Sequence, residues 1–417
     1  MNRKAIPSGD SAGASFRRSA LLLLPSQRHL FDIPNDIVYM NCAYMSALPK
    51  ATIVAGKRAM QRKGRPWTIE PRDFFSEAEA IRALFAQLIN ATADDIALVP
   101  AVSYGIAQAA HNIPINANQK ILTLADEFPS NVYPWMDLAQ RANTTVVAVP
   151  RPNDSDWTAA LLAHFDSSVA IVAVPHCHWT DGGLLNLEAV GRACRRIGAA
   201  LCIDGSQSLG ALPFDVKLID PDFVAVGTYK WLLGPYSAGF LYVAPRWQNG
   251  RPIEQNWIAR RGSEEFAALV NYRSEFQPGA RRFDVGQRSN FALNPAVKAS
   301  LELLLEWGIP RISATLKTRV DAIAERARHE LDLHCVPPLL RAGHYLGLHF
   351  GGPPPADLPT RLAAANVHVS VRGHSLRVTP HLWNNDNDVE TLFAVLNKSL
   401  KPAVRKHGPN IPDRHHK

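Results

Sequence analysis

Polar residues that could do chemistry follow directly on short apolar runs in this chain. The run "ALCID" ends in Asp204, and "DFVAVGTYK" ends in Lys230. A third run leads into "DEFPSN", which holds Phe128. Because ligands of parallel α/β sheets collect at the carboxyl ends of the strands, we expect these side chains to meet in one site. A lysine amine in such a site can form an imine with an aldehyde.

The neighbours of this lysine suit pyridoxal phosphate (PLP) as the aldehyde. PLP needs a carboxylate beside its pyridine nitrogen, which Asp204 can supply. Its phosphate needs backbone N–H groups and hydroxyls, which Ser103 and Tyr104 can supply where "IALVPA" leads into a helix. Phe128 can cover the ring by offset stacking. The sequence therefore predicts a PLP site built around Lys230.

Each of these residues alone also has an ordinary interpretation. A lysine after a strand is usually a solvated loop residue, Asp204 suits a turn in "DGS", and Phe128 suits simple packing. Their joint occurrence in this order favours the functional interpretation for Lys230 and Asp204. A nicotinamide dehydrogenase is a weak alternative because no strand is followed by G-x-G-x-x-G. A non-catalytic protein of the same fold would typically lack the lysine or the aspartate.

The strands that must position these residues are near-continuous apolar runs from residue 94 onward. Continuous runs indicate a sheet that is covered on both faces. Between two of them, "NLEAVGRACRRIGA" has the apolar period of a helix, which predicts a βαβ unit. The runs are "DIALVP", "KILTLAD", "TTVVAVP", "SVAIVAVP", "AALCIDG", "DFVAVGT" and "AGFLYVAP".

These elements predict an α/β fold with a large domain over residues 51–290 that holds a mostly parallel seven-stranded sheet. The helical stretches "NPAVKASLELLLEWG" and "RISATLKTRVDAIAERARHELDL" and the strand-like "HVSV" and "LRVTP" predict a small α+β domain over residues 291–398. We expect residues 31–50 to pack with the small domain. Residues 1–30 are expected to be a disordered basic tail, and residues 399–417 a basic tail.

The formal charge of +8 belongs to the two ends of the chain. Residues 1–30 carry +4 and residues 398–417 carry +5, which leaves the body near −1. A basic face for nucleic acid is therefore unsupported, and no apolar stretch is long enough to cross a membrane. The five cysteines form no CxxC pair, so neither a disulfide framework nor a metal site is indicated. We expect a cytoplasmic protein, with an N-terminal organellar transit peptide as the alternative.

The sequence resembles the aminotransferase class V family of fold-type I PLP-dependent enzymes, which includes cysteine desulfurases, kynureninases and isopenicillin N epimerase-like proteins. The resemblance covers about residues 35–397 and is strongest in "CIDGSQSLGALPFDV" and "DFVAVGTYKWLLGPYSAGFLYV", where the lysine follows the D-x-x-Q aspartate by 26 residues. It implies a homodimer with its active site at the subunit interface. Gln287 and Ser289, in "RFDVGQRSN", would reach the phosphate of the neighbouring subunit.

The resemblance also implies roles for individual residues around the cofactor. Lys230 would hold PLP and move the proton at the substrate Cα, and Asp204 would partner the pyridine nitrogen. Gln207 would donate a hydrogen bond to the phenolic oxygen of the ring. Phe128 stands where many relatives use a stacking histidine and resembles kynureninases there. Tyr229 resembles kynureninases too, as a phosphate ligand.

Substrate-binding residues follow from the same resemblance. Arg377, in "LRVTPHLWNNDNDV", would bind the substrate α-carboxylate through a bidentate pair. Asn41 and Tyr44, in "NCAYMS", would line the mouth of the site. His178, in "PHCHWTDGG", is counted with them, although a hydrogen-bonded turn histidine fits that segment equally well.

The reaction is less determined than the cofactor. Persulfide-forming desulfurases carry a nucleophilic cysteine shortly before the clamp arginine, whereas "NVHVSVRGHSLRV" has none and Cys335 lies 42 residues before Arg377. We therefore do not expect a thiol relay. The same lysine, aspartate and arginine serve transamination, cleavage at Cβ and racemisation. We expect an aminotransferase acting on a small amino acid, with a C-β lyase of the kynureninase or cysteine lyase type, or an epimerase, as alternatives.

Overall fold

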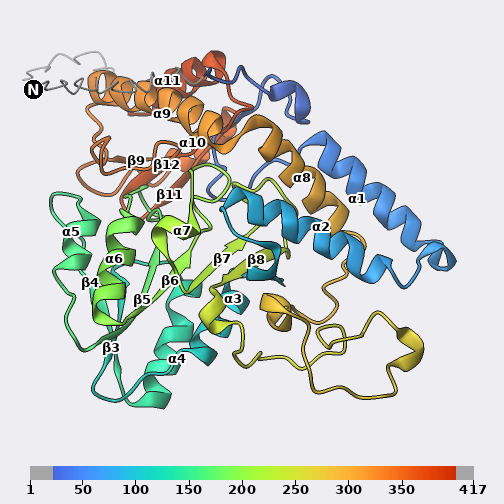
Figure 1. The fold of residues 1–417 in the computed structure, drawn as a ribbon. Coiled ribbons are helices and arrows are strands. Elements are labelled where there is room, and N and C mark those ends of the chain that lie inside the picture. The colour runs from blue at the N-terminus through green and yellow to red at the C-terminus, as the bar shows by residue number, and fades with distance from the viewer. Residues whose placement is uncertain (1–21, 401–417) are drawn as a thin grey trace, which may run out of the picture.

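The computed structural model describes residues 22–400. Figure 1 shows a large α/β body and a smaller domain, orange to red, that lies above the green strands. The outer parts of the two predicted tails, residues 1–21 and 401–417, lie outside the described residues.

A seven-stranded sheet forms the centre of the large body, with the strand order β2-β8-β7-β6-β5-β3-β4. Neighbouring strands from β4 to β7 pair in parallel, and β8 pairs antiparallel with both β7 and β2. The predicted mostly parallel seven-stranded sheet is therefore confirmed. The strands are β2 Ile96–Val99, β3 Lys120–Leu124, β4 Thr145–Val149, β5 Val169–Pro175, β6 Ala200–Asp204, β7 Phe223–Gly227 and β8 Gly239–Val243.

Helices cover this sheet on both faces, which explains the continuous apolar runs. Side chains of α3 and α4 pack on one face, and those of α2, α5, α6, α7 and α8 pack on the other. The predicted helical stretch is α6, which begins at the Asn186 cap and ends at Gly198 with a φ of 73°. The helices are α1 Lys50–Lys63, α2 Asp73–Leu88, α3 Val102–Asn112, α4 Tyr133–Ala142, α5 Trp157–Leu162, α6 Leu187–Ile197, α7 Val216–Ile219 and α8 Asn294–Trp307.

Short 3-10 helices occur within the connections. They are η1 Arg28–Leu30, η2 Pro66–Thr68, η3 Ala93–Asp95, η4 Pro129–Asn131, η5 Pro245–Trp247, η6 Phe266–Ala268 and η7 Gly279–Phe283.

The small domain is built on a three-stranded antiparallel sheet of β9 Leu346–His349, β11 Ser370–Arg372 and β12 Ser375–Val378. A separate pair joins β1 Val38–Tyr39 to β10 Val367–His368 in parallel, so the N-terminal segment lies against this domain. The domain also holds α9 Ile309–Leu331, α10 Leu358–Ala364 and α11 Asp386–Leu400. By contrast α8, which we assigned to the small domain, packs along α1 and α2 (Figure 1).

The predicted disordered tail over residues 1–30 is wrong for its last nine residues. The backbone N–H of Leu24 donates to Oγ1 of Thr315 on α9 at 2.9 Å. The N–H of Gln27 donates to the carbonyl oxygen of Leu382 at 2.8 Å. These contacts tie residues 22–30 to the small domain, and they bridge residues too far apart in the chain for a local pattern to reveal them.

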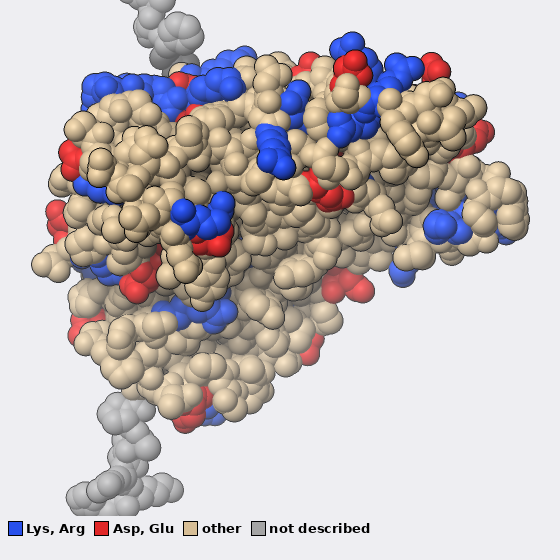
Figure 2. All heavy atoms as spheres, turned by 90° about the horizontal axis from the view of Figure 1, so that it is seen from below, with Lys and Arg blue, Asp and Glu red and all other residues tan. Residues whose placement is uncertain are grey.

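Charged side chains of both signs are scattered on the face in Figure 2, around a broad area that carries neither. Among residues 22–400, no helix combines the length and the apolar content needed to cross a bilayer.

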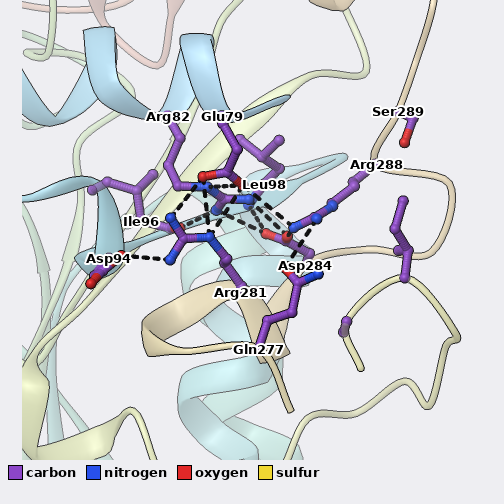
Figure 3. Close-up of polar contacts among 12 residues, drawn as sticks. Glu79, Arg82, Asp94, Ile96, Leu98, Gln277, Arg281, Asp284, Arg288 and Ser289 are labelled. Atoms are coloured by element: carbon purple, nitrogen blue, oxygen red, sulfur yellow. Dashed lines mark hydrogen bonds and ion pairs between the residues drawn. The ribbon is translucent and has the colours of Figure 1, made fainter. Parts of the chain in front are cut away.

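A buried ion network ties the segment before α8 to the large body (Figure 3). Both side chains of the Arg82–Asp284 pair are fully buried, with 2.8 Å between Nη2 and Oδ2. Asp284 also pairs with Arg288 and accepts the backbone N–H of Leu98 at 2.7 Å. Burial alone would raise the pKa of Asp284, but Arg82 and Arg288 hold it below its usual range. The network therefore joins α2, β2 and the segment that carries Gln287.

We expect Asp284→Asn to destabilise the protein by about 3 to 5 kcal/mol, because it removes the fully buried counter-charge of Arg82 and Arg288 and leaves them only the partly exposed Glu79. Denaturant unfolding followed by circular dichroism measures the change. Asp94→Asn is the matched control, since Asp94 pairs with Arg281 at the rim of the network and is 61% exposed. That control should cost less than about 1 kcal/mol, and equal losses for the two variants would contradict a central role for Asp284.

Candidate active site

A cavity of about 360 Å³ opens at the carboxyl ends of the parallel strands. Segments that follow β2, β3, β5, β6 and β7 all contribute to it, as the rule for open α/β sheets requires. Its lining residues are Pro100, Ala101, Val102, Ser103, Glu127, Phe128, Ser130, Pro175, Cys177, Trp179, Asp204, Ser206, Gln207, Gly227, Tyr229, Lys230, Tyr236, Ser237 and Ala238.

Lys230 projects from a tight turn between β7 and β8. The N–H of Leu233 donates to the carbonyl oxygen of Lys230 at 3.0 Å, and the N–H of Gly234 donates to that of Thr228 at 2.8 Å. Leu233 has a φ of 55°, a conformation that side chains disfavour and that is common at functional sites. Gly210, at a φ of 102°, permits a close approach: a Cβ there would lie 2.2 Å from the carbonyl oxygen of Trp231.

Lys230 and Asp204 are both buried in this cavity, yet they form no ion pair within residues 22–400. Lys230 is 7% exposed and Asp204 is 6% exposed. Burial lowers the pKa of Lys230 to about 8, against the opposing effect of Asp204. Burial likewise raises the pKa of Asp204, whose Oδ1 accepts the N–H of Ser206 at 2.8 Å. Two ionisable groups thus face one cavity without a full counter-charge.

Aromatic rings enclose the lysine amine. The Nζ of Lys230 lies 5.5 Å from the ring centre of Phe128 and 5.4 Å from that of Tyr229. Trp179 meets Phe128 edge to face at 5.4 Å, and its indole N–H donates to the carbonyl oxygen of Asp126 at 2.6 Å. Phe128 and Tyr229, both predicted at the site, thus lie beside Lys230.

The first turn of α3 forms another wall of the cavity. Ser103 lines it, and the first backbone N–H groups of this helix have no acceptor within the helix. The side chain of Tyr104 points elsewhere, because its hydroxyl donates to Glu254 at 2.8 Å. With its hydroxyl engaged by Glu254, the predicted part of Tyr104 in phosphate binding stays a prediction. Glu254 lies 150 residues further along the chain, so no local pattern indicated this partner.

Trp231 fixes the orientation of Gln207. Its indole N–H donates to Oε1 of Gln207 at 3.0 Å, which leaves the amide nitrogen to donate to the carbonyl oxygen of Ala43 at 3.1 Å. The backbone carbonyl of Gln207 lies 2.6 Å from Nε2 of His344. Trp231, which has an ordinary packing interpretation in the sequence, therefore positions the Gln207 donor at the cavity.

Arg377 is 2% exposed and is held by uncharged partners. Its Nε donates to Ser370 at 2.9 Å. Its Nη1 donates to the carbonyl oxygen of Trp179 at 3.0 Å and to the hydroxyl of Tyr345 at 3.1 Å. Among the described residues, Nη2 is the nitrogen without a partner. The predicted bidentate clamp is thus reduced here to one free nitrogen.

The three other residues predicted to bind substrate differ in their surroundings. Tyr44 is 53% exposed, and the buried Oδ1 of Asn41 has no hydrogen-bond partner within residues 22–400. His178 is fully buried, with Nδ1 2.8 Å from Oγ1 of Thr180 and Nε2 3.1 Å from the carbonyl oxygen of Ala125. Protein atoms lie within hydrogen-bond distance of both ring nitrogens, and the predicted contact of His178 with substrate stays a prediction.

Gln287 and Ser289 do not line this cavity of their own chain. Ser289 donates to the carbonyl oxygen of Phe74, and Gln287 has a φ of 62°. Their predicted role concerns the neighbouring subunit, so it stays a prediction.

The family model of aminotransferase class-V matches residues 70–389. The chain belongs to the aminotransferase class-V family. Its members are PLP-dependent enzymes, and the sheet and small domain described above are those of fold-type I, as the sequence predicts.

Relatives of this class-V chain carry several different names. It is 26% identical to the uncharacterized aminotransferase YcbU of Bacillus subtilis, over 78% of this chain and 84% of that protein. It is 27% identical to a kynureninase of Deinococcus radiodurans, over 76% of this chain and 78% of that protein. A solved structure of a C-DES variant with glycine covalently linked to its PLP cofactor superposes with a TM-score of 0.80 at 19% identity, covering 89% and 98% of the two chains.

The class-V cavity also contains residues that the sequence did not single out as site residues. Tyr236 and Ser237 enter it from the turn before β8, and Ser206 enters it after Asp204. Glu127 is 8% exposed, and its Oε2 has no partner among the described residues. Burial and the nearby Asp204 raise the pKa of Glu127 to about 8. The position of Glu127 directly after a strand was the one available signal.

We expect Lys230 of this class-V protein to have a pKa near 8, in contrast to about 10.4 for an ordinary lysine. Its reactivity toward a trace amount of a reagent that acylates amines should follow that pKa. Competitive labelling of the cofactor-free protein over a pH series, with peptide mass spectrometry, gives the value. Asp204→Asn should lower it further, because the negative charge of Asp204 favours the protonated amine. A value of 10 or above would contradict the buried environment.

Proposed function

We propose that this protein is a PLP-dependent enzyme that moves the amino group of a small amino acid. The observation that carries this proposal is the buried Lys230 and Asp204 in one cavity with no ion pair between them. A ring with a protonated nitrogen and an aldehyde fits between such groups, because each end would meet the charge or nucleophile that it needs. When bound, PLP supplies an electron sink for the bond that breaks at Cα.

Each residue then has a defined task. Lys230 holds the cofactor through its Nζ and carries the proton at the substrate Cα. Asp204 stabilises the protonated ring nitrogen, and Gln207, oriented by Trp231, donates to the phenolic oxygen. Phe128 covers the ring. Ser103 and Tyr229 bind the phosphate with the first N–H groups of α3.

Arg377 binds the substrate α-carboxylate in this proposal. Its Nη2 is available for the carboxylate, while Ser370, Trp179 and Tyr345 hold the other side of the guanidinium in a fixed plane. Asn41 and Tyr44 lie in the segment before α1, which is tied to the lysine turn by the hydrogen bond from Ser46 N–H to the carbonyl oxygen of Tyr229 at 2.9 Å. Substrate would therefore enter between the two domains.

The cysteines support amino transfer over persulfide formation. Cys177 lines the cavity, but burial raises the pKa of its thiol well above its usual range, so it is protonated at neutral pH. Burial raises the pKa of the Cys42 thiol in the same way. No cysteine stands between Cys335 and Arg377. A thiolate that accepts sulfur is therefore not among the groups at this site.

Cleavage at Cβ is the second candidate, and Phe128 and Tyr229 favour it because they resemble kynureninases at these positions. The relative from Deinococcus radiodurans carries that name. An epimerase would use the same Lys230, Asp204 and Arg377. A non-catalytic role is less well supported, because both the lysine and the aspartate are present.

We further propose that the protein is a homodimer. The largely irregular segment between β8 and α8, yellow in Figure 1, exposes 78% of Val270 and 98% of Tyr272. Apolar side chains this exposed favour burial against a partner. Light scattering should give twice the chain mass of 45.9 kDa; a monomer at micromolar concentration would contradict the proposal and leave Gln287 without a phosphate to reach.

The experiment for the function begins with the cofactor. We expect the purified protein with PLP to be yellow and to retain the label at Lys230 after borohydride reduction, whereas Lys230→Ala loses the covalent label. A protein that stays colourless with added PLP would contradict the proposal.

The same protein is then incubated with a panel of amino acids, with and without a 2-oxo acid. Amino transfer predicts pyridoxamine phosphate in the absence of the 2-oxo acid and a new amino acid in its presence. Release of a β-fragment with alanine or pyruvate would show a lyase instead. Deuterium uptake at Cα without either product would show an epimerase. Lys230→Ala is the control for all three readouts.

A further inference from the structure

The hairpin of β11 and β12 carries two arginines on one face. Ser370 pairs with Arg377 across the hairpin, and Arg372 pairs with Ser375. Because side chains alternate along a strand, Arg372 and Arg377 lie on the same face as diagonal neighbours. The hydrogen bond from Nε of Arg377 to Ser370 crosses that face. Arg377 is the arginine that our proposal assigns to the α-carboxylate, so Arg372 is the diagonal neighbour of that assigned group.

Neither arginine has an acidic partner within residues 22–400. Arg377 donates to the hydroxyl groups of Ser370 and Tyr345 and to the carbonyl oxygen of Trp179. Arg372 donates from Nη1 to the carbonyl oxygen of Val371 at 2.7 Å, which leaves its other N–H groups without a partner in this part of the chain. Arg372 therefore offers a freer guanidinium than Arg377 does.

The charges of Arg372 and Arg377 both affect the pKa of Lys230. Burial is the main cause of the low pKa of Lys230, but Arg377 and Arg372 lower it too, against the effect of Asp204. Burial and Arg377 lower the pKa of Arg372 itself, while Tyr345 and Tyr44 oppose this. Three cationic groups thus lie close enough to affect one another, and like charges at this range repel. A bound ligand with one carboxylate would neutralise only part of this charge.

We propose that Arg372 binds a second anionic group of the substrate, so that the preferred amino acid, or the 2-oxo acid that accepts its amino group, carries an acidic side chain. The inference rests on the proposed function, since it takes Arg377 as the site of the α-carboxylate. A planar guanidinium with free N–H groups binds a carboxylate through two parallel hydrogen bonds. Arg372 meets this requirement on the same face as Arg377.

Binding of unreactive acids to the PLP-loaded protein tests the inference without turnover. Glutarate and pentanoate have the same chain length and differ in one carboxylate. Isothermal titration calorimetry should give glutarate a dissociation constant at least 10-fold lower than that of pentanoate, because only glutarate can form a second hydrogen-bonded charge pair. A ratio of the pentanoate to the glutarate dissociation constant below about 3 would overturn the inference. This comparison uses the unsubstituted protein, so it does not depend on the folding of a variant.

Substitutions then show which arginine causes the difference in affinity between the two acids. Arg372→Gln should weaken glutarate binding about 10-fold and leave pentanoate unchanged, and Arg372→Lys should restore part of the loss because it keeps the charge. Arg377→Gln should weaken both acids. Arg328→Gln, an exposed position on α9, is the matched control and should change neither. Equal weakening of both acids by Arg372→Gln would overturn the inference, because both arginines would then share the α-carboxylate.

The outcome is separable from that of the proposed function. A protein that binds no PLP fails the proposed function before this test begins. A protein that binds PLP and transfers amino groups, but prefers no dicarboxylate, retains the proposed function and refutes the role of Arg372.

Discussion

The organisation of the site depends on two buried groups that do not neutralise one another. Asp204 ends β6 and Lys230 follows β7, which is its neighbour in the sheet. Adjacent strands bring the groups to one cavity, but the lysine turn keeps the amine out of ion-pair distance of the carboxylate. Burying such groups is costly unless a partner arrives. The cavity between them is thus suited to a ligand that carries both an electrophile and a protonated ring.

The turn that holds Lys230 depends on contacts from both domains. Trp231 packs edge to face on His344 from the small domain, with 4.3 Å between ring centres, and donates to Gln207 from the large domain. One indole therefore links the lysine turn, the D-x-x-Q segment and the small domain. A shift of the small domain would move Arg377, which it carries, and would also disturb Gln207 through the contacts of His344 and Trp231.

The acidic and the basic groups near Lys230 come from different domains. Asp204 and the raised-pKa Glu127 lie at the end where β3 and β6 terminate. The arginines of the β11–β12 hairpin, which lower the pKa of Lys230, belong to the small domain. A ligand whose cationic ring faces the large domain and whose carboxylates face the small domain is complementary to this arrangement. Burial is the main cause of the low pKa of Lys230, which Asp204 raises and the two arginines lower further.

The sequence by itself determined the sheet and the residues that stand at its carboxyl ends. Apolar runs indicate buried strands. Asp204 and Lys230 stand at the carboxyl ends of two such runs, so the direction of the strands alone carries them to the site. These are local signals. They also located α9 of the small domain, but not α11 or β9.

Only the tertiary structure decided where individual side chains point. Tyr104 bonds to Glu254, His178 is enclosed by Ala125 and Thr180, and Arg377 is held by Trp179 across 198 residues. Residues 22–30 join the fold through Thr315 and Leu382 for the same reason. Each of these outcomes rests on a hydrogen bond between distant segments, and the spacing of residues along the chain contains no information about such a bond until the segments are packed together.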